Sequence, residues 1–493
     1  MKYKILFLII LVVAILTRFI KLGSFPSGLT WDEAAIGYNA YGLITNHRDE
    51  WLKRTPIVFQ SFGDFKSPLL IYLTTIPVLI FGLTPFAVRI PIALAGTGLV
   101  ITSFFLTREI TKRKDVSLFV MFLIAVSPWA IHYSRMGFES MLATFLVSVG
   151  IFSWLKGRSK PVWMVVGDIC FALSLYAYHS AKIVVPLAAI ILCTLYYKDF
   201  FRHKKLLIIG TLLAIGILLP LGYASVFGKA NSRALSTTII GKPNMVSEFA
   251  NHYLTHLSPS FLLYGGDITY RHSTRQVGVL YPVELILFVF GILAIVMQKE
   301  YRKFWWIPVL FFIGLIPPAL GLDVPHSNRA LLALPWVQIT AGIGVFALAN
   351  RLKVESWKVA VFVSLFAVIS FVSYIQIYAT VYSSETALKE MGYGYDEVMN
   401  YVRSHEGEVD RVYFTNVYGQ AYIYILFAKK LTPVQYQNGG LANYTIANNP
   451  WKESQGKERV LVIGTADEIP DNANIVKEVK FPDGKIAFRI ARR

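Results

Sequence analysis

The chain opens with MKYKILFLIILVVAILTRFIKLGSFPSGLTWDEA, residues 1–34. A basic start leads into an apolar run that ends near Ile20, and no small-residue cleavage site follows it. The run therefore predicts a retained membrane-spanning helix rather than a signal peptide. Shortly after it stand Trp31, Asp32 and Glu33. The opening thus predicts a membrane protein that carries adjacent carboxylates just outside its first span.

The composition extends this prediction to most of the chain. Apolar residues make up 55% of the 493 residues, charged residues make up 16%, and the mean hydropathy is +0.51. Such a chain has too few charges for an ordinary water-soluble surface, so the lipid bilayer is its expected partner. The net charge of +18 is spread over short clusters between apolar runs instead of one basic patch. We therefore expect no nucleic-acid partner.

The basic clusters also predict the topology. Short cytoplasmic loops are enriched in Lys and Arg. If every basic cluster lies on the cytoplasmic side, the chain must cross the membrane twice between neighbouring clusters. The result is a multi-pass protein of the plasma membrane with about eleven spans, a cytoplasmic amino terminus and an extracytoplasmic carboxyl terminus. The expected spans cover residues 4–20, 84–106, 115–132, 138–155, 161–178, 182–197, 206–225, 282–298, 304–320, 329–349 and 358–379.

The apolar segment 68–81 does not fit this scheme. Its length of about 14 residues is short for a full crossing. A crossing there would also move the basic cluster at 108–114 to the outer face. We expect an interfacial or re-entrant helix on the outer side.

The C-terminal part of the chain has a different pattern. Residues 394–404 have helical spacing, whereas several later segments are rich in residues that favour β-strands. We expect a membrane domain over 1–380, with long outer loops at 21–83 and 226–281, followed by a small extracytoplasmic α/β domain over 381–493. The expected strands lie at 411–415, 459–464, near 475–480 and near 485–491.

Asp32 and Glu33 are the first catalytic candidates. Neighbouring side chains point in different directions on a helix or a strand, so one carboxylate can act as a base while the other orients it. The alternative is a helix cap for a helix through Ala34–Tyr41. Lys66 is a cation in the same loop, for which snorkelling is the alternative. The loop also contains the candidate substrate-binding residues Trp31, Tyr41 and Asp64.

Glu139 is a second acidic candidate, in the predicted outer turn after Arg135. A carboxylate at the edge of the hydrocarbon is costly unless it is paired, hydrated or used. Glu139 is therefore either a catalytic acid or the partner of Arg135 in a structural ion pair.

Three predicted outer turns repeat a combination of His, a cation and a hydroxyl: residues 178–182, 271–273 and 326–329. Arg and Lys supply charge for an anion such as a phosphate, and His and Ser supply hydrogen-bond donors. For any single His, an ordinary hydrogen-bonding role at the interface is the alternative. The phosphate-binding candidates are Lys66, Arg135, Lys182, Arg271, His272, His326 and Arg329, and His179 is a substrate-binding candidate.

Cofactor signals are weak. His, Asp and Glu on the outer face could hold a divalent metal, but no ligand motif of fixed spacing is present, so the metal residues stay unknown. The sequence has no phosphate-binding loop for a nucleotide and no nucleophile elbow. No cofactor is certain, and a divalent metal is possible.

Several short motifs, in order, resemble the membrane glycosyltransferases of the GT-C fold, in particular the group of protein O-mannosyltransferases and lipid A aminoarabinose transferases. The resemblance covers roughly residues 1–380 and is clearest over 1–180. It implies transfer of a sugar from a polyprenyl-phosphate carrier to a protein, lipid or glycan acceptor on the outer side of the membrane. The motifs are WDEA at 31–34, GDFKSP at 63–68, FG at 81–82, RIP at 89–91, SPW at 127–129 and SR at 134–135.

The resemblance also implies roles for individual residues. Asp32 matches the catalytic base with Glu33 as its neighbour, Glu139 matches an assisting acid, and Lys66 matches the lysine that binds the donor phosphate. The tail lacks the Trp-Trp-Asp motif of oligosaccharyltransferases, so transfer to asparagine is not expected. Phe65 stands where the aminoarabinose enzymes have an acidic residue that can help to hold a metal.

The main alternative function is a flippase or another transporter of lipid-linked sugars. Such proteins tend to place polar residues near the midplane of the membrane on broken helices, often in paired halves. The chain shows neither feature, and its carboxylates and cations gather on the predicted outer side. The transferase interpretation is therefore favoured.

Overall fold

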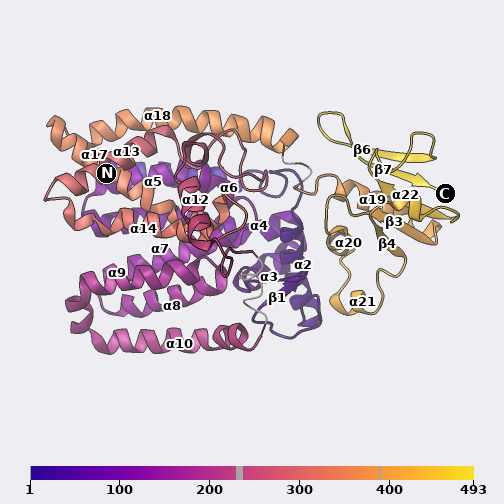
Figure 1. Cartoon of the computed structure of the whole chain (residues 1–493), viewed down its shortest axis with the longest axis horizontal. Helices are drawn as coiled ribbons and strands as arrows, with labels where there is room; N and C mark the ends of the chain where they lie inside the picture. Colours follow the sequence, from indigo (N-terminus) through magenta and orange to yellow (C-terminus); the bar gives the residue numbers. More distant parts are fainter. Residues whose placement is uncertain (1, 229–236, 387, 389) are drawn as a thin grey trace. The chain divides into compact units, whose positions relative to one another are not determined.

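The computed structural model describes residues 2–228, 237–386, 388 and 390–493 (Figure 1). Residues 229–236, within the loop predicted over 226–281, lie outside the described residues. The chain divides into two compact units. We call the first the helical unit; it comprises Met1–Ile20, Ser67–Leu70 and Ile92–Ile375. The second, the mixed unit, comprises Lys21–Lys66, Ile71–Pro91 and Gln376–Arg493.

The helical unit is built of apolar helices. Two more helices, α3 (Leu69–Phe81) and α4 (Pro85–Thr111), have residues in both units. The helices of the helical unit are α1 (Lys2–Phe19), α5 (Lys114–Val126), α6 (Pro128–Ser134), α7 (Glu139–Gly157), α8 (Val162–Ala177), α9 (Ala181–Arg202), α10 (Lys204–Val226), α12 (Met245–His256), α13 (Pro282–Met297), α14 (Trp306–Gly314), α15 (Ile316–Ala319), α16 (Ser327–Ala330), α17 (Leu334–Leu352) and α18 (Ser356–Ile377). Short helical turns occur at Ser260–Tyr264, Arg302–Phe304 and Leu331–Ala333.

Helices coincide with all the predicted spans, so the many-helix architecture is confirmed. Among the described residues, six helices are long and apolar enough to cross a membrane. A seventh arises if α5 and α6, bent by 56° at their break, form one span. The break is at Ser127, because the residue before Pro128 is disfavoured in the helical conformation. The number of crossings, the side on which each terminus lies and the position of α3 stay predictions.

Close helix packing depends on glycines. Helices α13 and α17 lie side by side (Figure 1). A Cβ atom on Gly291 would lie 2.2 Å from the carbonyl oxygen of Thr340, and one on Gly344 would lie 2.3 Å from that of Leu287. Small residues let two helix backbones approach in this way. A larger side chain at either glycine would push the two helices apart.

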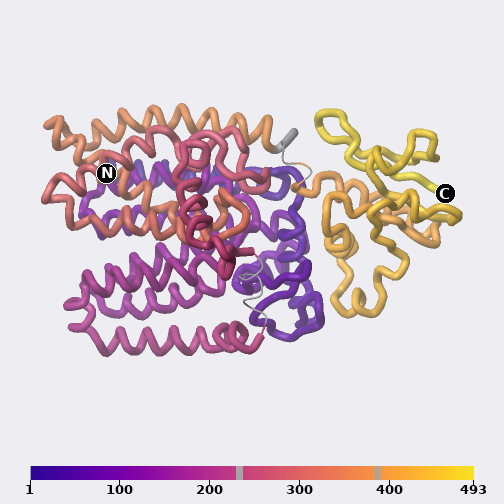
Figure 2. Tube along the Cα trace, viewed as in Figure 1, coloured from indigo at the N-terminus to yellow at the C-terminus, as the bar shows by residue number. Residues whose placement is uncertain are grey.

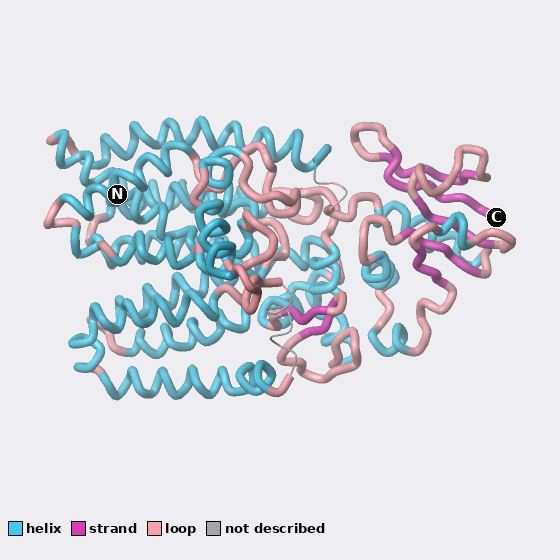
Figure 3. Tube along the Cα trace, viewed as in Figure 1, coloured by secondary structure: helices cyan, strands magenta, loops and turns pink. Residues whose placement is uncertain are grey.

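The mixed unit contains a five-stranded sheet and a separate hairpin (Figure 3). The sheet has the strand order β4-β3-β5-β7-β6. Strand β3 is parallel to β4 and β5, whereas β7 is antiparallel to β5 and β6. The elements are α2 (Trp31–Asn46), β1 (Phe59–Ser61), β2 (Asp64–Lys66), α19 (Tyr395–His405), β3 (Arg411–Thr415), α20 (Ala421–Lys429), α21 (Pro433–Gln437), β4 (Tyr444–Ala447), α22 (Pro450–Glu453), β5 (Val460–Gly464), β6 (Ile475–Lys480) and β7 (Ile486–Arg492). The predicted C-terminal helix and the four predicted strands are confirmed.

The segments Lys21–Lys66 and Gln376–Arg493 share one hydrophobic core, although they lie far apart along the chain (Figure 2). Ala34 and Tyr38 of α2 are buried in the same cluster as Phe414 of β3. The Tyr422 hydroxyl donates to the carboxylate of Glu50 at 2.9 Å. Helix α2 is therefore fixed by the C-terminal sheet region. The C-terminal residues 376–493 form one unit with residues 21–66. The division into two domains at residue 380 therefore stays a prediction.

Candidate functional site

Helix α2 begins with a capping box. The Thr30 hydroxyl accepts a hydrogen bond from the Glu33 backbone N–H at 3.2 Å, and the Glu33 carboxylate accepts one from the Thr30 backbone N–H at 3.0 Å. This reciprocal pair satisfies two backbone donors that a helix terminus otherwise leaves unpaired. The helix begins at Trp31, which places Asp32 in its first turn, where the helix dipole favours a negative charge.

Arg89 holds the Glu33 carboxylate from the other side. The two side chains are 0% and 1% exposed, and Arg89 Nε lies 2.7 Å from Glu33 Oε1. The same guanidinium donates to the carbonyl oxygens of Leu22, Pro26 and Gly28 at 2.7–3.1 Å. Glu33 is thus a buried support that fixes the first turn of α2, while its neighbour Asp32 is 33% exposed.

The hairpin of β1 and β2 brings Lys66 to Asp32. Its turn is at Phe62 and Gly63, both with positive φ (55° and 76°), the conformation that two-residue hairpin turns of type I′ require. Lys66 Nζ forms an ion pair with Asp32 and lies 5.2 Å from the ring centroid of Phe62. At 5% exposure the Lys66 side chain does not extend into solvent, as snorkelling would require. The hairpin thus joins a partly exposed carboxylate to a buried cation.

The other candidate residues in the mixed unit contact residues of the same unit. Trp31 packs against the core of this unit, and the Tyr41 hydroxyl donates to the backbone carbonyl of Lys430 at 3.1 Å. Asp64 Oδ1 accepts from the backbone N–H of Phe65 at 2.7 Å. Their contacts with substrate stay predictions.

Sequence reasoning gave no role to Glu50, which the structure buries completely. Burial raises the pKa of Glu50 to about 7, since the carboxylate form is poorly solvated there, and the nearby Asp49 acts in the same direction. Its hydrogen bond from Tyr422 links the segment Lys21–Lys66 to α20. The adjacent acids Asp49 and Glu50 were a signal in the sequence. However, Tyr422, the partner of Glu50, is 372 residues away along the chain.

Arg135 ties down the end of α1 in the helical unit. Its Nη1 and Nη2 atoms each donate at 2.8 Å, to the carbonyl oxygens of Thr17 and Ile20 respectively. Glu139 starts α7 and is half-buried. Arg135 therefore has a structural role at a helix terminus, and its predicted contact with a donor phosphate stays a prediction.

The three predicted His turns lie together within the helical unit. The Ser180 hydroxyl donates to the carbonyl of Arg329 at 3.1 Å, which joins the turn that contains His179 and Lys182 to the turn that contains His326. The Ser327 hydroxyl donates to the carbonyl of His272 at 3.0 Å, which joins the second turn to the third. Two further contacts involve these turns: His132 Nε2 with the carbonyl of Arg271 at 2.9 Å, and Arg329 Nη1 with the carbonyl of Thr237 at 3.3 Å.

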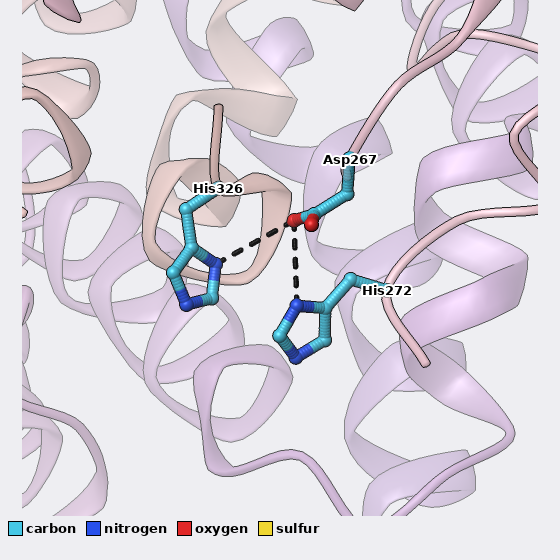
Figure 4. A group of neighbouring side chains, drawn as sticks. All are labelled: Asp267, His272 and His326. Atoms are coloured by element: carbon cyan, nitrogen blue, oxygen red, sulfur yellow. Dashed lines mark ion pairs between the residues drawn. The ribbon is translucent and has the colours of Figure 1, made fainter. Parts of the chain in front are cut away.

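At the centre of these turns, Asp267 faces His272 and His326 (Figure 4). Asp267 Oδ2 lies 3.3 Å from His272 Nδ1 and 3.6 Å from His326 Nδ1. Burial acts to raise the pKa of Asp267, but the charge and hydrogen bond of His272 outweigh it and hold that pKa well below its usual range. One ligand atom from each of the three residues lies within 4.8 Å of the others, a group able to hold a metal ion. Asp267 was not a sequence candidate, although it precedes His272 by only five residues.

Comparisons with known proteins identify the fold. No known family model and no curated protein sequence matches the chain significantly. The structure is similar to apo ArnT from Cupriavidus metallidurans, with a TM-score of 0.58 and 11% identity over 98% of this chain and 97% of that one. ArnT bound to undecaprenyl phosphate matches with a TM-score of 0.55 and 10% identity over the same shares.

A second group of matches is the oligosaccharyltransferase AglB from Archaeoglobus fulgidus. Its complex with an inhibitory peptide and a dolichol-phosphate matches with a TM-score of 0.51 and 11% identity, over 94% of this chain and 69% of that one. The apo form matches with a TM-score of 0.54 and 12% identity, over 94% and 70%. The helical bundle and the C-terminal sheet region together therefore have the GT-C fold of these membrane glycosyltransferases.

Proposed function

We propose that the chain is an integral-membrane glycosyltransferase that moves a sugar from a polyprenyl-phosphate carrier to an acceptor hydroxyl on the outer face of the membrane. The observation that carries the proposal is the Asp32–Lys66 ion pair at the first turn of α2. The fold supports this proposal. Two proteins of the same fold have structures with a polyprenyl phosphate: ArnT bound to undecaprenyl phosphate, and AglB with a dolichol-phosphate.

The two charged groups match the two demands of this reaction. Asp32 takes the proton of the acceptor hydroxyl as its oxygen forms a bond to the anomeric carbon. The bond from that carbon to the carrier phosphate breaks, and the polyprenyl phosphate leaves with the electron pair and an added negative charge. Lys66 stabilises this charge, and its burial strengthens the interaction because little water screens it.

The ion pair itself suggests how the donor prepares the site. The donor phosphate is a diester whose two non-bridging oxygens share one negative charge, and it gains further charge as the bond to the sugar breaks, so it can accept hydrogen bonds from the Lys66 ammonium. When the donor binds, the Lys66 ammonium shifts its hydrogen bonding from Asp32 to the phosphate. The Asp32 carboxylate, no longer bound by the Lys66 ammonium, accepts the acceptor proton. Glu33 acts as a positioning residue, since the capping box and Arg89 keep it in place.

A single displacement of this kind inverts the anomeric configuration, because the acceptor attacks from the face opposite the leaving phosphate. In the helical unit, Glu139 is proposed as an assisting acid. Phosphate binding by cations and imidazoles of the same unit is likewise proposed from their residue types, for Arg135, Lys182, Arg271, His272, His326 and Arg329.

Asp32→Asn tests the proposal. The amide keeps the shape of the side chain but cannot accept the proton, so we expect transfer from a polyprenyl-phosphate sugar to fall by about 10²–10⁴-fold. The matched control is Asp410→Asn, which removes the acid of the exposed pair between Asp410 and Arg459. Transfer by Asp32→Asn at more than half the rate of the control variant would exclude Asp32 as the base.

A further inference from the structure

We propose that Asp267, His272 and His326 form a binding site for a divalent metal ion of the Zn²⁺ type, with a coordination position left open for an oxygen ligand. The proposal goes beyond the proposed transfer reaction and does not depend on it. The three residues come from two segments of the helical unit, the loop after Ser260–Tyr264 and the segment before α16. Figure 4 shows both imidazoles directed at the same carboxylate.

The spacing of the three ligand atoms fits a tetrahedral metal. With zinc–ligand bonds of about 2.0–2.2 Å, neighbouring ligand atoms of a tetrahedral site lie about 3.3–3.5 Å apart. Asp267 Oδ2 lies 3.3 Å from His272 Nδ1 and 3.6 Å from His326 Nδ1. The second distance is too long for a hydrogen bond. All three ligand atoms lie within 4.8 Å of one another, so an ion placed between them is within reach of each.

His326 offers a buried ring nitrogen to this site. The rings of His272 and His326 stack with centroids 4.7 Å apart and planes inclined by 23°, an arrangement that two imidazolium cations would oppose. His326 Nδ1 is buried, and among the described residues it has no hydrogen-bond partner. A buried nitrogen of this kind costs free energy unless something binds it.

A second layer of hydrogen bonds fixes the ligands. Asp267 Oδ1 accepts from the backbone N–H and hydroxyl of Thr269 at 3.0 and 3.1 Å. Asp267 Oδ2 accepts from the backbone N–H of Ser327 at 2.7 Å. The backbone N–H of His326 donates to His256 Nε2 at 3.0 Å. Metal ligands are typically oriented by such contacts, because fixed ligands lose less freedom when the ion binds.

The ligand set identifies the class of ion. Two imidazoles and one carboxylate suit Zn²⁺ and related transition metals, whereas Mg²⁺ and Ca²⁺ prefer oxygen ligands throughout. Three protein ligands leave a fourth tetrahedral position for water or an oxygen of a bound anion. A pocket lined by His132, Tyr133 and Ser273 adjoins His272, so a water molecule has room beside the site.

The test is direct metal binding by the full-length protein in detergent. The chain is purified with a chelator and dialysed. Zn²⁺ binding is then titrated against a chromophoric chelator, and bound metal is counted by mass spectrometry. We expect one Zn²⁺ per chain in the wild type, and at least a tenfold weaker affinity in Asp267→Asn, His272→Gln and His326→Gln. Co²⁺ in the same site should give the visible absorption of a four-coordinate ion, and this absorption should change on addition of inorganic phosphate.

The control is His405→Gln in α19 of the mixed unit, which should bind Zn²⁺ like the wild type. Thermal unfolding in the presence of the chelator separates loss of metal from loss of fold, and His272→Gln should then unfold at the wild-type midpoint. A wild-type chain without bound Zn²⁺ after titration, or unchanged affinity in all three ligand variants, would overturn the proposal. Both readouts count metal rather than sugar transfer, so failure of this site and failure of the proposed transfer reaction are distinguishable.

Discussion

Arg89→Met tests the structural role assigned to Glu33. The substitution keeps most of the side-chain volume but removes the charge that neutralises a carboxylate only 1% exposed. Breaking one half of a buried ion pair costs about 3–5 kcal/mol, because the remaining charge is left in a poorly solvated place. The carbonyls of Leu22, Pro26 and Gly28 also lose their donor. We therefore expect the free energy of unfolding to fall by at least about 3 kcal/mol.

Equilibrium unfolding in mixed micelles, with a rising fraction of SDS, measures this loss. A double-mutant cycle with Glu33→Gln isolates the interaction. Each single variant leaves one buried charge without its partner, whereas the double variant leaves neither charge. The double variant should therefore lose less stability than the sum of the two single variants, by on the order of 2 kcal/mol. Arg459→Met is the control, since its pair with Asp410 is exposed and such pairs contribute about 0–1 kcal/mol. Equal effects of Arg89→Met and Arg459→Met would refute the structural role of Glu33.

Two further predictions concern the segment Lys21–Lys66. The folded state binds more protons at Glu50 than the unfolded state between the ordinary pKa of 4.5 and the raised pKa of about 7, so stability is lost as pH rises through this window. Glu50→Gln should therefore raise the unfolding midpoint at pH 8, with a gain in the free energy of unfolding of at most about 3 kcal/mol. At pH 5 the same substitution should change the midpoint little. An equal change at both pH values would contradict the raised pKa of Glu50. Lys66→Ala should weaken binding of a polyprenyl-phosphate sugar by about tenfold or more, as expected for a lost charge-assisted hydrogen bond of about 1.5–3 kcal/mol. Unchanged donor affinity in isothermal titration would remove Lys66 from the phosphate site.

Local patterns predicted the elements of the fold well. The strand predicted at 411–415 coincides with β3, and the helix predicted over 394–404 coincides with α19 to within one residue. Alternation and helical spacing are properties of a few neighbouring residues, so a single sequence reveals them. The number of crossings was harder, because α8 and α13 have only 16 residues each and length alone does not decide whether such a helix spans a membrane.

Long-range partners explain what the sequence could not show. Glu33 meets Arg89 across 56 residues, and Glu50 meets Tyr422 across 372. The pattern of residues 31–33 was compatible with both a base and a helix cap, and the structure assigns the cap and the buried ion pair to Glu33. Asp267 was missed for a related reason: its neighbours His272 and His326 come together only after two separate segments fold against each other.

The most direct test of the proposed function is donor consumption by the purified chain. The protein is incubated with a panel of polyprenyl-phosphate sugars and candidate hydroxyl acceptors, and released polyprenyl phosphate is measured together with the configuration of the product. We predict that one donor is consumed, that its sugar is transferred with inversion, and that Asp32→Asn abolishes the release. Consumption of no donor by the wild type, or a product of retained configuration, would contradict a single displacement with Asp32 as base.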